Sequence, residues 1–251
     1  MTAPTQAARR PPFVAIVVYA LQACLPAKRR LGLLLPCVGA VLFGLLAHLD
    51  TATDTVAFAN VAGIALFAIV IPIGCLVIGD AVLGAEARSG TLHFTWLSPV
   101  PLATIVVGRW LAGFVASLAS VTLACVVAAI VAGAPDAAPA VALAAAAGCA
   151  AYIGLFVMIG AITRRAAVWS LAIVVLVERL LGAALAGIAQ LSPMWEARAV
   201  FAELGPGADD LIRDGIPQGW GAVIRLGIVL VVTLVVASWR LSHLRLTGAS
   251  D

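Results

Sequence analysis

The sequence predicts an all-α integral membrane protein with six transmembrane helices, because of its composition, its hydropathy and the length of its apolar runs. Of 251 residues, 63% are hydrophobic and 11% are charged, whereas soluble domains carry about 25% charged residues. The mean hydropathy is +1.13. A helix needs about 20 apolar residues to cross the hydrocarbon core. Six stretches meet this length, at Leu31–Leu49, Val56–Ile78, Ile105–Ala132, Ala138–Ile162, Ala166–Ala189 and Trp220–Trp239. We expect residues 1–251 to form one domain.

The segment before the first span, residues 12–26, is expected to be an interfacial helix between two prolines, because it is too short to cross a bilayer. Its apolar residues share one face at helical spacing, as in a helix lying in the headgroup plane. They are Val14, Val17, Val18, Leu21 and Leu25. A cleaved secretory signal after Arg9-Arg10 is the alternative, but Gln22 suits a cleavage site poorly and Lys28 and two arginines follow closely.

The distribution of basic residues predicts that both termini are cytoplasmic. With the N-terminus inside, eleven of the fifteen Lys and Arg residues lie at the cytoplasmic ends of the spans, which the positive-inside rule favours. These are Arg9, Arg10, Lys28, Arg29, Arg30, Arg88, Arg109, Arg164, Arg165, Arg240 and Arg245. The opposite loops carry mostly acids, at Asp50, Asp54, Asp136, Glu196, Glu203, Asp209, Asp210 and Asp214.

The outer segment 190–219 is expected to hold two short helices that dip toward the membrane. Ser192-Pro193 is a favourable helix start, and the first helix then runs to the Gly205-Pro206-Gly207 stop. The run "ADDLIRD" predicts the second, which ends at Gly215. A mobile loop is the alternative.

Several kinds of chemistry have no motif in this chain. There is no GxxxxGK[ST] phosphate loop, and the single lysine, Lys28, has no glycine-rich turn before it. His48, His93 and His243 are far apart, and the five cysteines all lie in apolar runs without metal-ligand spacing. We therefore expect no enzyme activity, disulfide, metal or cofactor on this chain itself. A basic stripe with interleaved aromatics is also missing, which argues against nucleic-acid binding.

One compact polar segment, "EARSGTLHFTWLSPVP" from Glu86 to Pro101, interrupts the apolar sequence within the loop 79–104. Glu86 and Arg88 supply charge, Gly90 can end a helix, and Ser98-Pro99 can start the next element. Leu92, Phe94, Trp96 and Leu97 form an apolar cluster. Two interpretations fit these residues: an ordinary cytoplasmic loop, or a rigid docking site between two spans, which would transmit motion to them.

The run "EARSGTLHFTWLSPVPLATIVVGRWLA" resembles the signature of ABC-2 type transporter permeases. In that family a Glu-rich helix precedes Gly-Thr-Leu, then Leu-x-Ser-Pro and a basic residue that opens the third span. The matching residues are Glu86, Gly90, Thr91, Leu92, Leu97, Ser98, Pro99 and Arg109. Arg88 or Ser89 stands where the family often has a second acid. The interfacial "elbow" helix, the six spans and the outer helices extend the resemblance over nearly the whole chain, which implies the type V exporter (ABC-2) fold.

The resemblance implies a permease subunit of an ATP-driven ABC exporter in a bacterial inner membrane. A separate cytoplasmic ATPase would bind ATP and Mg²⁺ and dock against the segment Glu86–Leu97, with Lys28, Arg29 and Arg30 adding to the docking surface. A second permease, identical or different, would complete the pathway for an amphipathic or hydrophobic cargo such as a drug, natural product, lipid or glycan intermediate. The alternatives are a secondary transporter and a membrane assembly or sensor subunit that transports nothing.

Charged residues inside the spans are functional candidates, because burying one in a membrane costs about 2.5–3.5 kcal/mol. Glu178 and Arg179 lie well inside the fifth span, and adjacent helical residues point apart. We predict that Glu178 pairs with Arg225 of the last span, either to lock the two helices together or to line a pathway. In the second span, Asn60 is a candidate for a bond to a neighbouring helix or to cargo, and Pro72 predicts a bend.

Overall fold

The computed structural model describes residues 11–24, 27–49, 53–84, 100–163 and 165–243, with the backbone alone for residues 27–30. These residues form helices and short connections, and no strand occurs among them. Six helices are long and apolar enough to cross a membrane. They are Leu31–His48, Asp54–Gly84, Leu102–Val131, Pro135–Ile162, Ala166–Ala184 and Gly219–Ser242. By the length and composition of its helices, this is an all-α, multi-pass membrane protein.

The first two spans agree with the predicted ones in place, but the second is longer than predicted. Helix α2 covers Ala27–His48. The second span is a continuous run of α3 (Asp54–Val61), η1 (Ala62–Val70), α4 (Ile71–Gly79) and η2 (Asp80–Gly84). The segments η1 and η2 are π-helical. The π-helical segment η1 ends just before Pro72, where the helix lacks an N–H donor.

The third and fourth spans form an antiparallel pair joined by a short turn. The third consists of α7 (Leu102–Ser117), the π-helical η3 (Leu118–Thr122) and α8 (Leu123–Val131). A 3-10 turn, η4 (Pro135–Ala137), leads into α9 (Ala138–Ile162), whose bounds match the sequence prediction.

The fifth span ends earlier than predicted. It comprises α10 (Ala166–Ala172), η5 (Ile173–Leu181) and α11 (Gly182–Ala184). Leu185 then takes an extended conformation, with φ −123° and ψ 111°, and separates these from the short α12 (Ala186–Ala189). The predicted span Ala166–Ala189 was wrong in its last turn, because composition does not reveal a single extended residue inside an apolar run.

The segment before the last span contains one true helix rather than two. Helix α13 covers Pro193–Leu204, and Ser192 caps it by accepting a hydrogen bond from the backbone N–H of Trp195. The second predicted helix is a single 3-10 turn, η6 (Asp209–Leu211), because the chain is extended again at Ile212. The last span, α14, covers Gly219–Ser242.

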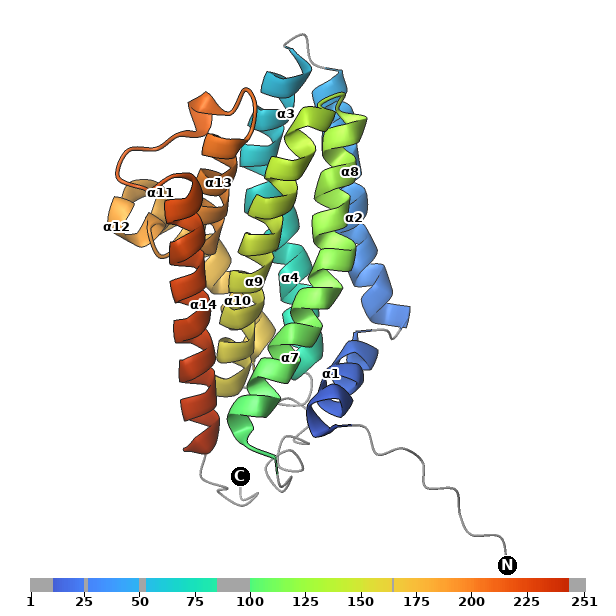
Figure 1. The fold of residues 1–251 in the computed structure, drawn as a ribbon, viewed down its shortest axis with the longest axis vertical. Coiled ribbons are helices and arrows are strands. Elements are labelled where there is room, and N and C mark those ends of the chain that lie inside the picture. Colours follow the sequence, from blue (N-terminus) through green and yellow to red (C-terminus); the bar gives the residue numbers. More distant parts are fainter. Residues whose placement is uncertain (1–10, 25–26, 50–52, 85–99, 164, 244–251) are drawn as a thin grey trace, which may run out of the picture.

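Helix α9 lies at the centre of the bundle and packs against α4, α13 and α14 (Figure 1). Small residues permit close approach: a Cβ added at Gly148 would lie 3.0 Å from the Ala197 Cβ of α13. Ala140, Ala144 and Gly148, which lie four residues apart along α9, are all buried. Small-residue contacts of this kind are typical of membrane helices.

The 12-residue helix α1 (Pro12–Ala23) lies at one end of the bundle beside the start of α7 (Figure 1). A Cβ added at Gly108 would come within 3.5 Å of Phe13 and 2.9 Å of Ile16, so these two helices touch there. The predicted apolar face is correct in part: Val17 and Leu21 pack on the core, whereas Val14 is 43% exposed. Both η2, which ends at Gly84, and α7, which begins at Leu102, contact α1.

Candidate functional site

The predicted docking residues lie at or beyond the limits of the described structure. Glu86, Arg88, Gly90, Thr91, Leu92, Leu97, Ser98 and Pro99 fall outside the described residues. Lys28, Arg29 and Arg30 occupy the first turn of α2, where the backbone alone is described. Their roles therefore stay predictions.

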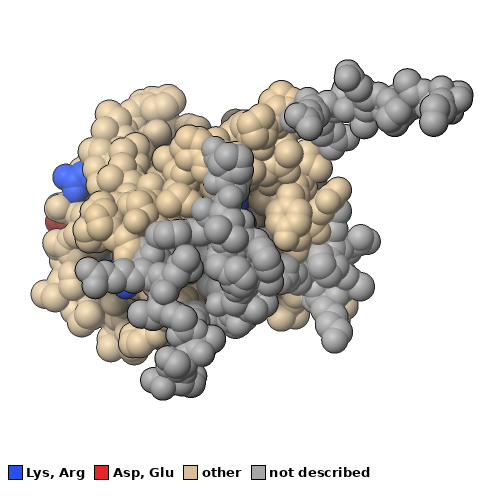
Figure 2. Space-filling model, turned by 90° about the horizontal axis from the view of Figure 1, so that it is seen from below, with Lys and Arg blue, Asp and Glu red and all other residues tan. Residues whose placement is uncertain are grey.

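The span ends that flank the polar loop are tied together. Arg109, near the start of α7, is 5% exposed, and its Nη1 donates a hydrogen bond of 2.9 Å to the backbone oxygen of Val82 in η2. Seen from the α1 end, the described surface is almost entirely uncharged (Figure 2). This hydrogen bond joins the second and third spans close to the described residues on either side of the segment 85–99.

A second group of polar residues lies inside the bundle, around Glu178 of η5, where η5, α9 and the start of α13 meet. This side chain is 2% exposed. Its Oε2 accepts a 2.5 Å hydrogen bond from the hydroxyl of Tyr152 on α9, and its Oε1 accepts a 2.8 Å bond from the hydroxyl of Ser192. The backbone N–H of Met194 also donates to the carboxylate. Glu178 therefore sits at the N-terminus of α13, where unpaired N–H groups and the helix dipole favour an anion.

Two more side chains fasten α13 to the fifth span. The indole Nε1 of Trp195 donates to the backbone oxygen of Glu178 at 3.1 Å. Arg213, which follows η6, donates to the backbone oxygens of Gly182 and Ala183 at 2.8 and 2.9 Å. Its guanidinium also lies 4.4 Å from the centre of the Trp195 ring, within cation–π range. We call the set Tyr152, Glu178, Ser192, Trp195 and Arg213 the α13 latch.

The predicted pairing of Glu178 with Arg225 is wrong in this structure. Arg225, on α14, instead lies 3.9 Å from Oε1 of Glu196, measured from Nη1. Glu196 is one of the acids that the charge distribution placed in the outer loops, but α13 packs against the bundle and buries it at 0% exposure. Because α13 packs against both the fifth and the last span, Arg225 pairs with Glu196, whereas Glu178 bonds to Tyr152 and Ser192.

The buried carboxylate of Glu196 has few favourable polar contacts to offset its burial. Within the described part of the chain, neither of its oxygens has a hydrogen-bond partner. Burial raises the pKa of Glu196 from 4.5 to about 7, and the positive charge of Arg225 opposes this rise. Burial, followed by the charge of Arg213, lowers the pKa of Arg198 on the same helix. Glu196 can therefore change its charge near neutral pH.

The remaining intramembrane candidates are exposed. Arg179 points away from its neighbour Glu178, as predicted for adjacent residues on a helix, and has no salt bridge or hydrogen bond within the described chain. Asn60 is exposed at the surface of α3 and makes no side-chain hydrogen bond to the described residues. An exposed polar group on a spanning helix needs a headgroup, water or a partner chain.

Sequence reasoning missed Tyr152 and Glu196. A signal existed for Tyr152, because it is one of two tyrosines in the chain and lies inside an apolar span, where a phenolic hydroxyl requires a partner. The partner itself could not be inferred without knowing that α9, η5 and α13 meet. For Glu196, the alternation of polar and apolar residues did not indicate burial.

The described residues include the α13 latch, which joins η5, α9 and α13. Among them no group of three or more His, Cys, Asp or Glu side chains is placed to hold a metal ion. No family model matches the chain, and no curated protein has significant sequence similarity to it. Function is therefore inferred from the residues of this chain and their arrangement.

Proposed function

We propose that the protein is the permease subunit of an ATP-driven ABC exporter of the ABC-2 type, in a bacterial inner membrane with both termini cytoplasmic. One observation carries the proposal. The segment with Glu86, Thr91 and Ser98 lies in the sequence between η2 and α7, and both of these helices contact α1. We infer that a soluble partner docks at this end of the bundle, next to α1.

The hydrogen bond from Arg109 to Val82 supports transmission of force from that surface. Because it joins the two spans next to the polar loop, a push on the loop moves both spans as one body rather than separating them. Helix α1 contacts Gly108 of the third span. It would therefore move together with the second and third spans. Packed helices carry such motions as rigid units.

The energy source in this proposal is a separate ATPase, because the chain has no phosphate loop. ATP and Mg²⁺ would be bound by that partner. Closure of the ATPase pair would act on the loop around Glu86–Leu97, and Lys28, Arg29 and Arg30 would add positive charge to the docking surface.

We place the transport pathway between two permease subunits, either two copies or two different chains. The interior of the described bundle is filled by side chains, and many of these are alanine. The exposed polar residues of the spans, Arg179 and Asn60, are the candidates for contact with cargo or with the second permease. The apolar surface favours an amphipathic or hydrophobic cargo.

The test is reconstitution with a candidate ATPase in lipid vesicles, with ATP hydrolysis measured in the presence and absence of the permease. Glu86→Ala and Thr91→Ala should lower permease-dependent ATP turnover, while the elution profile and melting temperature stay those of wild type. Val231→Ala, on the exposed face of α14, is the matched control. If the chain purified alone drives transport from an ion gradient, it is a secondary transporter and the proposal fails.

A further inference from the structure

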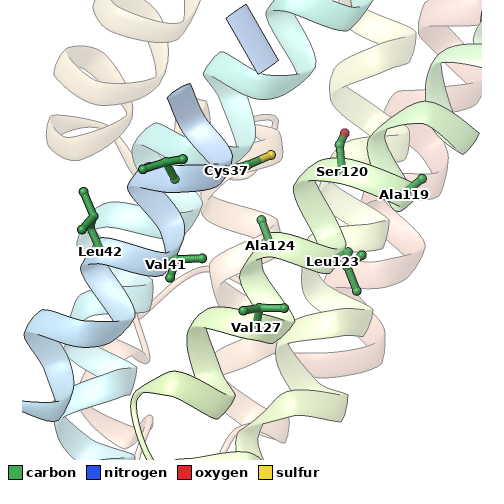
Figure 3. A pocket seen from close by; sticks show the side chains of 9 residues that line it. Cys37, Val41, Leu42, Ala119, Ser120, Leu123, Ala124 and Val127 are labelled. Carbon is green, nitrogen blue, oxygen red and sulfur yellow. The ribbon is translucent and has the colours of Figure 1, made fainter. Parts of the chain in front are cut away.

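A crevice opens on the membrane-facing side of the bundle, between α2 and the third span (Figure 3). Its volume is about 430 Å³, within the range of small-ligand pockets. Cys37 and Val41 point from α2 toward Leu123 and Ala124 across the gap. The remaining lining residues are Val38, Leu42, Ala119, Ser120 and Val127.

The crevice lies where α2 and the third span diverge from each other. At Gly44 they touch: a Cβ added there would lie 2.9 Å from the Cα of Ala128. From this contact toward the start of α2, the helices diverge. Pro36 lies inside α2 and the π-helical η3 interrupts the third span, both next to the crevice. Proline and π-helical segments locally alter helix geometry and often mark functional places.

The crevice wall is apolar and faces outward from the bundle. Val38, Leu42 and Leu123 are 52%, 54% and 56% exposed, so they present apolar surface outward. The hydroxyl of Ser120 is already used, because it donates to the backbone oxygen of Ala116 at 2.7 Å. An occupant must therefore be an apolar chain rather than a polar solute.

In the sequence, three basic residues stand in the first turn of α2. Helix α2 begins with Ala27-Lys28-Arg29-Arg30, and Arg30 precedes Cys37 by seven residues. At about 1.5 Å per residue, this separation is about 10 Å along the helix. Half of the hydrocarbon core is about 15 Å. A lipid with its headgroup at the start of α2 would therefore carry an acyl chain past Cys37 toward the bilayer centre.

We propose that this crevice is a binding site for an anionic phospholipid, which inserts one acyl chain between α2 and the third span and places its headgroup at the Lys28-Arg29-Arg30 turn. Basic clusters at the end of a spanning helix attract anionic headgroups. The inference is independent of the exporter proposal, since it requires only that α2 and the third span lie in a bilayer.

The direct test is native mass spectrometry of the full chain after equilibration with equal amounts of palmitoyl-oleoyl phosphatidylglycerol and phosphatidylcholine. Wild type should retain phosphatidylglycerol over phosphatidylcholine by about fivefold or more, the factor that corresponds to about 1 kcal/mol for one basic residue near an anionic surface. Ala119→Phe should abolish retention of either lipid by filling the crevice. Ala119 is exposed, so the larger side chain does not overpack the core. Val231→Phe, on the equally apolar face of α14, is the control and should bind as wild type.

The headgroup is tested by the triple variant Lys28→Gln, Arg29→Gln, Arg30→Gln, which should lose the preference for phosphatidylglycerol while keeping bound phosphatidylcholine. Equal retention of both lipids by wild type, or unchanged retention by Ala119→Phe, overturns the proposal. Oxidative cross-linking of Cys37 in one copy to Cys37 in another would also overturn it, because the face would then be an interface between copies. Melting temperatures close to wild type show that each variant is folded.

Discussion

Two helices of equal length that do not span the membrane occupy opposite ends of the bundle, and they are held in different ways. Helix α1 and helix α13 each have 12 residues and begin at a proline. In α1 the single buried residue is Ala20, and its N-terminus has no side-chain cap. In α13 eight residues are buried and Ser192 caps the start. Helix α13 also has the α13 latch.

The difference shows which end of the molecule is fixed and which is available for contact. A helix with buried hydrogen bonds and aromatic packing moves only with the helices around it. Helix α1 keeps much of its surface exposed, including Tyr19 at 59%, and it lies beside the span ends that flank the polar loop. We therefore propose a structural role for the α13 end and a partner contact for the α1 end.

The largest expected effect is a difference in the free energy of unfolding between two matched Phe→Ala variants, one in α13 and one in α1. Phe201 of α13 is 0% exposed and its ring centre lies 6.1 Å from Phe58 and 5.6 Å from Phe67. Phe201→Ala should lower the free energy of unfolding by about 3–5 kcal/mol through a cavity. Phe13→Ala, at a half-buried position of α1, should cost about 1 kcal/mol or less. Thermal unfolding in detergent measures both, and equal losses would contradict the contrast.

The next largest loss of stability is expected when the α13 latch is broken. Glu178→Ala removes the acceptor of Tyr152 and Ser192 and leaves their buried hydroxyls unpaired. The expected loss is about 3 kcal/mol, since each unpaired buried group costs about 1–3 kcal/mol. Glu178→Gln keeps an acceptor and should lose less. Arg179→Ala is the control for the neighbouring exposed side chain; if it destabilises as much as Glu178→Ala, the α13 latch does not hold α13.

A third prediction concerns the contact that bounds the crevice. Gly44→Ala puts a methyl group against the Ala128 backbone, so α2 and α8 must move apart. We expect a loss of about 1–3 kcal/mol from overpacking. Gly39, in the same helix, has nothing within 4 Å of an added Cβ. Gly39→Ala should therefore be neutral or stabilise by about 0.5–1 kcal/mol. Melting temperatures that rank the two variants the other way would exclude a tight α2–α8 contact.

The smallest effect is a pH dependence at the α13 end. The pKa of Glu196 in the folded protein, about 7, lies above its ordinary value of 4.5. The folded state therefore holds this proton over the window between those values, and stability falls as the pH rises through it. Glu196→Gln should reduce the drop in melting temperature between pH 5 and pH 8. Glu203→Gln, an exposed carboxylate on α13, should leave that drop in place.

Helix positions followed from local sequence, whereas the polar contacts did not. Long apolar runs predicted the spans, and the Ser192-Pro193 start predicted α13, because both signals lie within a few neighbouring residues. The break at Leu185 has no such signal. The partners of Glu178 and Arg225 depend on how α13 folds back between α9 and α14, which is a property of the packed chain. The docking residues of the polar loop lie outside the described structure and stay predictions.

The central claim is that a nucleotide-binding protein docks at the α1 end, and site-specific photo-crosslinking in cells tests it most directly. A photoreactive amino acid would replace Thr91 in the polar loop and, as the control, Glu203 at the α13 end. The account predicts that Thr91 cross-links to a protein with a GxxxxGK[ST] motif and that Glu203 does not. A Thr91 position that captures no nucleotide-binding protein, or a Glu203 position that captures the same one, would contradict it.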